Sequence, residues 1–183
     1  MKRCFWVDEK SEIYVKYHDK EWGNPKFDDR DLLELLILEG FQAGLSWLTV
    51  LKKRQAFRVE YENFDVEKVA NFDEKKIAKM LANKEIIRSE QKIRASILNA
   101  KIFMKIQKEF GSFSDYIWGF TGHKVVYNSD GKVIVSNELS DKISKDLKKR
   151  GMKYVGTVIV YSYLQAIGVV NDHDKECFLH KES

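Results

Sequence analysis

Hydrophobic positions recur at helical spacing along most of this chain, and the sequence therefore predicts a mainly α-helical fold. The strongest signal is an apolar run from Leu32 to Leu38. Asp28, Asp29 and Asp31 precede it and supply an N-cap and favourable first-turn charges for a helix from Leu32. Further helices are expected at residues 46–57, 65–70, from 73 onward, 89–105 and 140–150.

Four other segments carry weaker patterns. Residues 1–27 are rich in aromatic side chains and predict irregular or short helical structure. Residues 113–120 predict an aromatic turn region, and residues 125–135 contain Asn128-Ser129-Asp130-Gly131, a local β-hairpin signal. Residues 155–170 fit both a strand and a helix, and we assign a helix because the surrounding segments are helical.

Glu39 ends the apolar run and follows Leu32, Leu35 and Leu36 at helical spacing, which places its carboxylate on an apolar face. A carboxylate in such a position costs several kcal/mol, to order of magnitude, unless it is paired or hydrogen-bonded. Either another residue satisfies Glu39, or the carboxylate is kept for a ligand that brings donors or positive charge. The spacing alone leaves both interpretations open.

Composition narrows the class of protein. With 183 residues, of which 44% are hydrophobic, the chain can bury a core of its own. No apolar run approaches the ~20 residues that span a bilayer, and no signal-peptide core follows the N-terminus, so a cytoplasmic protein is expected. The formal charge of +4 permits nucleic-acid binding without demonstrating it.

Both ends of the chain carry residues that bind metals. Cys4 and His18 lie near one end, and His173 and Cys177 lie near the other at an i, i+4 spacing that one helical turn would bring together. Two cysteines with two histidines form a common tetrahedral zinc set. Residue types alone also allow inert thiols and unrelated histidines, and the chain holds two spare histidines, His123 and His180.

Several sequence blocks together resemble one family. They are Arg3-Cys4-x-Trp6-Val7, Tyr17-His18-Asp19-x-Glu21-Trp22-Gly23, Leu38-Glu39-Gly40-x-Gln42-Ala43-Gly44-Leu45-Ser46-Trp47-x-Thr49-Val50-Leu51-Lys52-Lys53-Arg54, Leu147-Lys148-Lys149-Arg150-Gly151-x-Lys153-x-Val155-Gly156-Thr157 and Gly168-x-Val170-Asn171-Asp172-His173-x3-Cys177. In this order, with no large gap, they resemble the bacterial DNA-3-methyladenine glycosylase I family. The blocks at 38–54 and 171–177 are the most specific.

The resemblance implies a helix-hairpin-helix DNA glycosylase fold whose N- and C-terminal segments are joined by one structural zinc ion, held by Cys4, His18, His173 and Cys177. The chain is expected to be a single glycosylase unit, or two lobes made of residues 1–30 with 110–183 and of residues 31–109. The hairpin is expected at residues 83–88, within a helix-hairpin-helix around 77–105. Such hairpins usually carry glycine, and this one has none, so Asn83 is expected to supply a left-handed residue.

The resemblance also implies a site for an extruded 3-methyladenine, with Glu39 as the catalytic residue and an aromatic wall of Tyr14, Tyr17, Trp22 and Trp47. Leu45 would be the wedge that fills the gap left in the base stack, within a DNA-binding set of Gln42, Gly44, Leu45, Lys148 and Lys149. The basic runs 52–54 and 148–150 are candidates for phosphate contacts, although such runs are also common on solvated surfaces.

These residue types suit the removal of a cationic base. Methylation at N3 leaves adenine positively charged while it is attached to deoxyribose, and ring faces of Tyr and Trp attract a cation. Because the charged base is already a good leaving group, a weakly catalytic site suffices, with water as the nucleophile. No lysine is placed to form a Schiff base, which predicts a monofunctional enzyme without strand cleavage.

Two alternatives remain at this stage. A zinc-stapled module that binds lesions in nucleic acid without cutting would share the metal and the salt dependence. A glycosylase for another alkylated purine would share the chemistry, although Glu39 in a tight pocket penalises bases that cannot donate to it. The expected partners are alkylated double-stranded DNA and the free 3-methyladenine product, for a monomeric bacterial protein.

Overall fold

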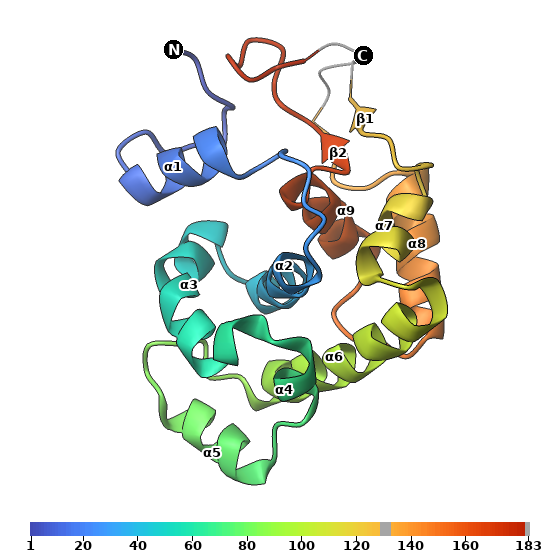
Figure 1. Cartoon of the computed structure of the whole chain (residues 1–183). Coiled ribbons are helices and arrows are strands. Elements are labelled where there is room, and N and C mark those ends of the chain that lie inside the picture. Colours follow the sequence, from blue (N-terminus) through green and yellow to red (C-terminus); the bar gives the residue numbers. More distant parts are fainter. Residues whose placement is uncertain (129–132, 182–183) are drawn as a thin grey trace.

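The computed structural model describes residues 1–128 and 133–181 and is mainly helical, as predicted. Figure 1 shows the helices packed around α2, which is seen end-on at the centre of the molecule. The elements described are α1 (Glu12–Lys20), α2 (Asp29–Gln42), α3 (Trp47–Glu60), a 3-10 turn (Glu62–Phe64), α4 (Val66–Ala70), α5 (Glu74–Ala82), α6 (Glu90–Phe110), α7 (Phe113–Gly119), β1 (Val126–Tyr127), α8 (Glu138–Lys149), α9 (Thr157–Ala166) and β2 (Val170–Asn171).

Local sequence sets where most of these helices begin. A short polar residue at the N-cap accepts a hydrogen bond from a free backbone N–H of the first turn, which stabilises each start. The N-cap side chains that do so are Asp28, Ser46, Asp65, Asp73, Ser89, Ser112 and Asn137. Because Asp28 is the cap, α2 begins at Asp29, three residues before the predicted Leu32.

Helix α2 is buried on every side, since each residue from Leu32 to Phe41 is buried. A helix that is apolar all round belongs in a protein interior. The helix therefore forms the middle of the core, and the polar side chains that it carries, Glu34 and Glu39, are buried with it. Burial on α2 therefore does not by itself distinguish Glu39 from Glu34. The two residues differ in the groups that surround their carboxylates.

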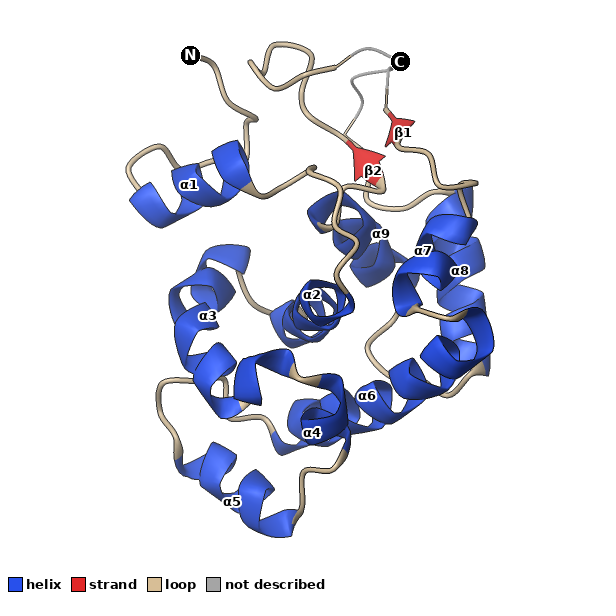
Figure 2. Cartoon of the chain, in the orientation of Figure 1, coloured by secondary structure: helices blue, strands red, loops and turns tan. Residues whose placement is uncertain are grey.

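One prediction for the middle of the chain is wrong, and a second cannot be compared with the structure. Residues 113–119 form the helix α7 instead of an aromatic turn, because Ser112 caps the helix and its aromatic side chains pack into the core. The hairpin signal at 128–131 lies largely outside the described residues. The adjoining strand β1 pairs in parallel with β2, with Val126 opposite Val170. Figure 2 shows these two short strands beside an otherwise helical molecule.

The assignment of a helix to residues 155–170 is confirmed for α9, which ends at Ala166. Gly168 follows at φ +75°, and a Cβ there would lie 2.3 Å from the backbone carbon of Asn24. Glycine is therefore required for the close packing of residues 23–26 against the end of α9. Gly23 N–H and Lys26 N–H donate to the carbonyls of Gln165 and Ile167, which fixes the segment that carries Trp22.

The N-terminal segment and the described segment after β2 lie at the same side of the molecule, as Figure 1 shows. Phe178 N–H donates to the Lys2 carbonyl over 3.0 Å, and Phe5 N–H donates to Asp174 Oδ2 over 2.7 Å. Within the described residues, no helix is both long enough and apolar enough to span a bilayer. The fold thus brings the terminal blocks of the sequence together against the central helix.

Candidate active site and metal centre

Four metal-binding side chains converge where the two ends of the chain meet. The sulfur and nitrogen atoms of Cys4, His18, His173 and Cys177 all lie within 4.8 Å of one another, and all four residues are buried. Cys4 Sγ lies 3.4 Å from His173 Nδ1, and Cys177 Sγ lies 3.5 Å from His18 Nε2. Tetrahedral zinc bonds of ordinary length place neighbouring sulfur and nitrogen ligands roughly 3.5 Å apart. The group can hold one metal ion.

Surrounding groups hold these side chains ready to coordinate. His18 Nδ1 lies 2.8 Å from Asp19 Oδ1, which leaves Nε2 directed into the cluster. Arg3 in turn donates to both carboxylate oxygens of Asp19 and holds the pKa of Asp19 at about 2, well below its usual value. Burial lowers the pKa of His173 to about 4, so its ring is neutral and able to bind a cation. A carboxylate behind a ligating histidine is the usual support of a metal site.

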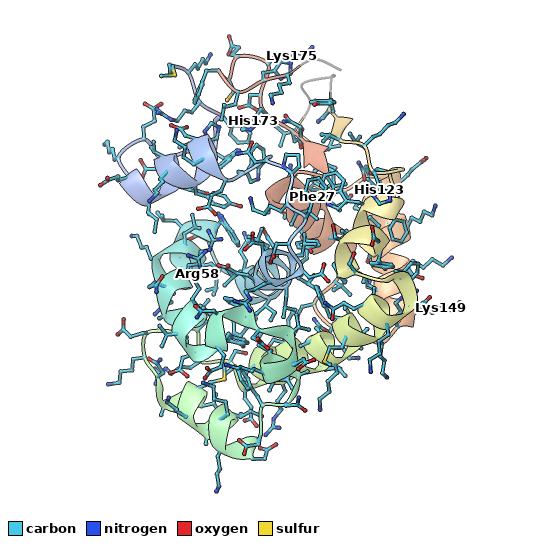
Figure 3. All side chains as sticks on the ribbon, viewed as in Figure 1. Phe27, Arg58, His123, Lys149, His173 and Lys175 are labelled. Atoms are coloured by element: carbon cyan, nitrogen blue, oxygen red, sulfur yellow. The ribbon has the colours of Figure 1, made fainter. Side chains whose placement is uncertain are left out.

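The spare histidines lie outside the cluster. His180 Nδ1 lies 2.8 Å from the His173 carbonyl oxygen and so supports the backbone of the ligand. Figure 3 shows His123 beside α7, well apart from His173. The predicted helical turn at 173–177 is wrong, because these residues form a hydrogen-bonded turn in which Cys177 N–H donates to the Asp174 carbonyl. The turn brings both ligands to the same side, as a helix would.

A pocket of about 250 Å³ lies beside this cluster and contains the predicted base-binding residues. Its lining comes from the N-terminal segment, α1, α2, the start of α3, α9 and the segment after β2: Phe5, Trp6, Tyr14, Tyr17, Trp22, Glu39, Gln42, Trp47, Asn128, Val133, Ile134, Ser162, Gln165, Asp172, His173 and Asp174. Glu39, Tyr14, Tyr17, Trp22 and Trp47 are thus brought together, as predicted from the sequence. The pocket can enclose a planar base.

Glu39 is the unusual residue of this pocket. Its side chain is buried, with 4% of the residue exposed, and burial raises its pKa to about 8. Within residues 1–128 and 133–181, the buried side-chain atoms without a hydrogen-bond partner are Glu39 Oε2 and Trp47 Nε1. Both residues line the same pocket. One unpaired acceptor and one unpaired donor in a single cavity are costly in the empty protein and indicate a ligand that pairs with both.

The aromatic rings of the pocket pack against one another in a tilted pair, Tyr17 with Trp47, and an edge-to-face pair, Trp6 with Trp22. The ring centroids of Tyr17 and Trp47 lie 5.5 Å apart, and those of Trp6 and Trp22 lie 5.0 Å apart. Burial, together with the nearby Glu39 carboxylate, raises the pKa of the Tyr14 and Tyr17 hydroxyls. Both tyrosines therefore stay neutral and offer electron-rich faces without adding negative charge.

Sequence reasoning missed two parts of the pocket. Trp6 lies between the pocket and the metal cluster, with its ring centroid 5.2 Å from Tyr14 and 5.3 Å from His18. Asp172 accepts hydrogen bonds from Tyr161 and Gln165 at Oδ2 and from Asn128 at Oδ1. Both residues stand in the sequence blocks quoted above, but only the fold brings them into the cavity.

The segment between α2 and α3 places the predicted wedge on the surface. Gly44 has φ +81°, a backbone conformation that favours glycine, and a hydrogen bond from Leu45 N–H to the Gln42 carbonyl closes the turn. Gln42 lines the pocket, whereas Leu45 is 41% exposed. One turn therefore carries a pocket residue and an exposed apolar side chain three positions apart.

The basic runs are only partly available for an anionic partner. Arg54 donates to Glu34 and Glu21, and Arg150 is paired with Glu109 and Asp146. These two arginines hold the fold together and are poor candidates for phosphate contacts. Lys148 and Lys149 are exposed, and Figure 3 shows Lys149 at the outer edge of α8, away from His173.

Residues 83–89 connect α5 to α6 by a turn, where the hairpin is predicted. The expectation of a left-handed Asn83 is wrong, since Asn83 has φ −80° and ψ 110°. Its side chain closes the turn instead: Oδ1 accepts from Glu85 N–H, and Nδ2 donates to Glu60. Lys53 Nζ donates to the carbonyls of Lys84 and Glu85, so this lysine supports the turn.

Comparison with known proteins agrees with this geometry. The family model described as methyladenine glycosylase matches residues 6–180. The chain is 43% identical over 178 residues to a DNA-3-methyladenine glycosylase of Haemophilus influenzae, covering 96% of each chain. The fold resembles a crystal structure of 3-methyladenine DNA glycosylase I, with a TM-score of 0.93, 44% identity and coverage of 98% of this chain and 100% of that one.

A second solved structure is a variant of 3-methyladenine DNA glycosylase I in complex with 3-methyladenine. It matches with a TM-score of 0.92 and 33% identity, covering 100% of this chain and 99% of the other. An aromatic pocket around an unpaired carboxylate thus lies on the fold of the solved 3-methyladenine DNA glycosylases. The chain belongs to the methyladenine glycosylase family.

Proposed function

We propose that this protein repairs alkylated DNA by hydrolysing the N-glycosidic bond of 3-methyladenine after the damaged nucleotide has left the duplex. The observation that carries this proposal is the pair of unpaired polar atoms, Glu39 Oε2 and Trp47 Nε1, in one aromatic pocket. The family and the names of its relatives support the same reaction.

The pocket recognises the base by hydrogen bonds and charge. The Glu39 carboxylate accepts a hydrogen bond from the exocyclic amino group of adenine, and Trp47 Nε1–H donates to a ring nitrogen. The faces of Tyr14, Tyr17 and Trp22 attract the positively charged base. A 7-methylguanine has an oxygen in place of that amino group and would leave Glu39 unpaired, which disfavours it strongly.

Bond cleavage then needs little further help. The cationic base departs as a neutral molecule, while the deoxyribose gains oxocarbenium character that a nearby carboxylate or the DNA phosphates stabilise. Water attacks the sugar carbon, and its proton passes to solvent. Glu39 is the catalytic residue of this scheme and acts through hydrogen bonding and electrostatics. The enzyme is proposed to be monofunctional, without lyase activity.

DNA is held by three parts of the fold in this proposal. Residues 74–110 act as a helix-hairpin-helix unit, in which α5, the turn 83–89 and α6 present backbone groups to the phosphates. Gln42, Gly44 and Leu45 belong to the turn that meets the damaged nucleotide, and Leu45 replaces the extruded nucleotide in the base stack. Lys148 and Lys149 add contacts to phosphates.

The chain is proposed to be a single glycosylase unit, because one cluster of buried hydrophobic residues runs from Cys4 to Cys177. We propose that this unit acts as a monomer in the bacterial cytoplasm.

The metal group is proposed to hold one structural zinc ion. Cys4 and Cys177 would supply two thiolates, and His18 and His173 two neutral imidazoles, a complete set of four ligands that would leave no position for a catalytic water. Bound zinc would supply stability by fastening the N-terminal segment to residues 173–177. The residues it fastens also support the pocket, because Trp6 and Trp22 contact the rings of His18 and His173.

The test is chromatography of the free bases that purified protein releases from methylated duplex DNA. We expect 3-methyladenine to be released while 7-methylguanine stays in place, with no DNA strand cut and no adduct trapped by borohydride. Release of a different base would assign another alkylated purine. A folded, zinc-loaded protein that binds the DNA and releases nothing would be a lesion-binding module, and the proposed reaction would be wrong.

A further inference from the structure

Lys92 reaches from α6 to the end of α2, where the wedge-bearing turn begins. Its Nζ donates to the Phe41 carbonyl over 3.0 Å and to the Ala43 carbonyl over 2.6 Å. The last carbonyls of a helix have no partner within the helix and need one from elsewhere. The Gln42 carbonyl between them accepts from Leu45 N–H. Three successive carbonyls are thus satisfied, two of them by one side chain.

The amine of Lys92 is itself held in place. It lies 6.0 Å from the centroid of the Tyr154 ring, within the range of a cation–π contact. Tyr154 has φ +54°, which is uncommon for a bulky residue, and its Cβ would lie 3.4 Å from a Cβ at Gly40. Gly40, two residues before the end of α2, thus packs against the Tyr154 side chain whose ring faces Lys92.

The unusual backbone at Tyr154 has an identifiable support. The buried side chain of Asn99 donates to the Lys153 carbonyl over 2.8 Å and accepts from Lys153 N–H over 2.9 Å. Both main-chain groups of one residue are thereby fixed by a single side chain on α6. Strained backbone persists only where the surroundings hold it, and such positions often serve a function.

We propose that Lys92 is a positioning residue, which fixes the turn 42–45 so that Gln42 enters the base pocket while Leu45 points out toward DNA. The proposal rests on the function proposed above. Lys92 does not touch the base in this scheme. It sets the directions of Gln42, which lines the pocket, and of Leu45, which is exposed three positions further along the chain.

The same lysine joins the wedge to the hairpin. Ser89, the N-cap of α6, accepts from Lys92 N–H, so Lys92 stands in the first turn after residues 83–89. The position of Leu45 relative to the hairpin is then fixed, so that Leu45 can enter the duplex while the hairpin binds the phosphates. Because Nζ is already engaged by two carbonyls, it is unsuited to attack an abasic sugar, in agreement with a monofunctional enzyme.

The test compares Lys92→Met with Lys16→Met. Lys16 is exposed on α1 and lies outside both the pocket and the proposed DNA-binding unit, so its loss controls for the change of net charge. We expect Lys92→Met to slow 3-methyladenine release from duplex DNA by roughly 30-fold to 100-fold, because a small misplacement of a positioned group costs that much. Release from single-stranded DNA and the affinity for free 3-methyladenine should fall less than release from duplex DNA, since both depend on Gln42 in the pocket but neither requires a wedge.

A double-mutant cycle with Leu45→Ala makes the test independent of fold stability. If Lys92 acts through the wedge, Leu45→Ala adds little in the Lys92→Met background on duplex DNA. Fully additive losses, or equal losses on duplex and single-stranded DNA, would overturn the proposal and leave Lys92 as a general stabiliser of the fold. A wild-type protein that releases no base from either DNA would instead refute the proposed function.

Discussion

Glu34 and Glu39 lie five residues apart on the buried helix α2, and their carboxylates have opposite surroundings. Glu34 accepts hydrogen bonds from Arg54 and from Arg58. Glu39 Oε2 has no partner, and burial raises the Glu39 pKa to about 8. The first carboxylate stabilises the fold through its arginines, whereas the second is kept unpaired at a cost in stability. This contrast distinguishes the glutamate that stabilises the fold from the one for which we propose a role in base recognition.

The first prediction concerns how stability depends on pH. Below pH 4.5, Glu39 is protonated in both folded and unfolded protein, and it carries no penalty. As pH rises from 4.5 toward 8, the unfolded chain releases this proton while the folded protein keeps it, so the free energy of unfolding falls. Above about pH 8 both forms are ionised and the penalty is constant. Glu39→Gln removes the penalty, and its advantage over wild type should grow by roughly 3–5 kcal/mol across this window.

Denaturant unfolding of both proteins at pH 5, 6.5 and 8.5 measures this difference, in which contributions from the metal site cancel. The matched control is Glu34→Gln, which should lower stability at neutral pH by about 1–3 kcal/mol because it removes one of the two carboxylates that pair with the buried Arg54. A constant stability difference between Glu39→Gln and wild type over the whole window would show that Glu39 is not held in its protonated form.

The second prediction separates charge from hydrogen bonding in catalysis. An amide oxygen at position 39 still accepts from the exocyclic amino group, and the cationic base is a good leaving group without further activation. We therefore expect Glu39→Gln to lower kcat/KM for 3-methyladenine release by only a few-fold. Single-turnover measurements on methylated duplex DNA decide this. A loss of several hundred-fold would assign the main role to the negative charge of the carboxylate.

The sequence predicted many of the helix starts and Glu39, but it did not predict every residue that lines the pocket around Glu39. Asp28, Ser46 and Ser89 mark helix starts through local chemistry that needs no tertiary structure, and these starts were predicted closely. Glu39 was identified by its unusual place in an apolar run. Trp6 and Asp172 were not, because an aromatic and an acidic residue near the chain ends carry no signal until folding brings them together.

The wrong assignments have the same physical origin. Aromatic residues at 113–120 suggested a turn, but burial of Phe113 and Trp118 in the core stabilises a short helix there. Strand β1 pairs with residues 170–171, a partner too distant in sequence for any local pattern to predict. Arg54 and Arg150 belonged to basic runs, yet each is engaged by carboxylates from other elements. Long-range pairing decides these cases.

The third prediction concerns the donor that has no partner in the pocket. Trp47→Phe keeps an aromatic ring but removes the buried Nε1–H, so the free energy of unfolding should stay constant or rise. The affinity for free 3-methyladenine should fall about tenfold, as expected for one lost hydrogen bond. Calorimetric titration with the free base measures this affinity.

The control for this prediction is Trp118→Phe. Trp118 Nε1–H donates to the Lys26 carbonyl over 2.8 Å and lies outside the pocket. Its loss should lower the stability of the protein and leave base affinity unchanged. A Trp47→Phe protein that binds the base as tightly as wild type would remove Trp47 Nε1 from the recognition scheme.

The fourth prediction concerns the metal. Cys177→Ser should abolish stoichiometric zinc binding and lower Tm by roughly 10 °C or more, because the lost metal no longer fastens the two chain ends. His180→Ala removes a histidine that contacts only the backbone of His173, and it should retain one zinc per chain. Elemental analysis of the purified proteins gives the metal content. Zinc retained in full by Cys177→Ser would show that the cluster is not the site.

The fifth prediction concerns phosphate contacts by the two exposed lysines of α8. Each lysine that neutralises a phosphate releases a condensed counterion, so binding weakens with salt in proportion to the number of such contacts. Replacing Lys148 and Lys149 with alanine should therefore weaken binding to methylated duplex DNA and reduce the slope of log affinity against log salt by about 1–2. Affinity for free 3-methyladenine should not change, because neither lysine lines the pocket. Fluorescence anisotropy between low and physiological salt measures the slope.

The control is the double alanine variant of Lys10 and Lys16, two exposed lysines at the opposite end of the sequence, because it changes the net charge by the same amount. If both double variants reduced the slope to the same extent, the effect would come from overall charge, and Lys148 and Lys149 would not bind phosphates directly.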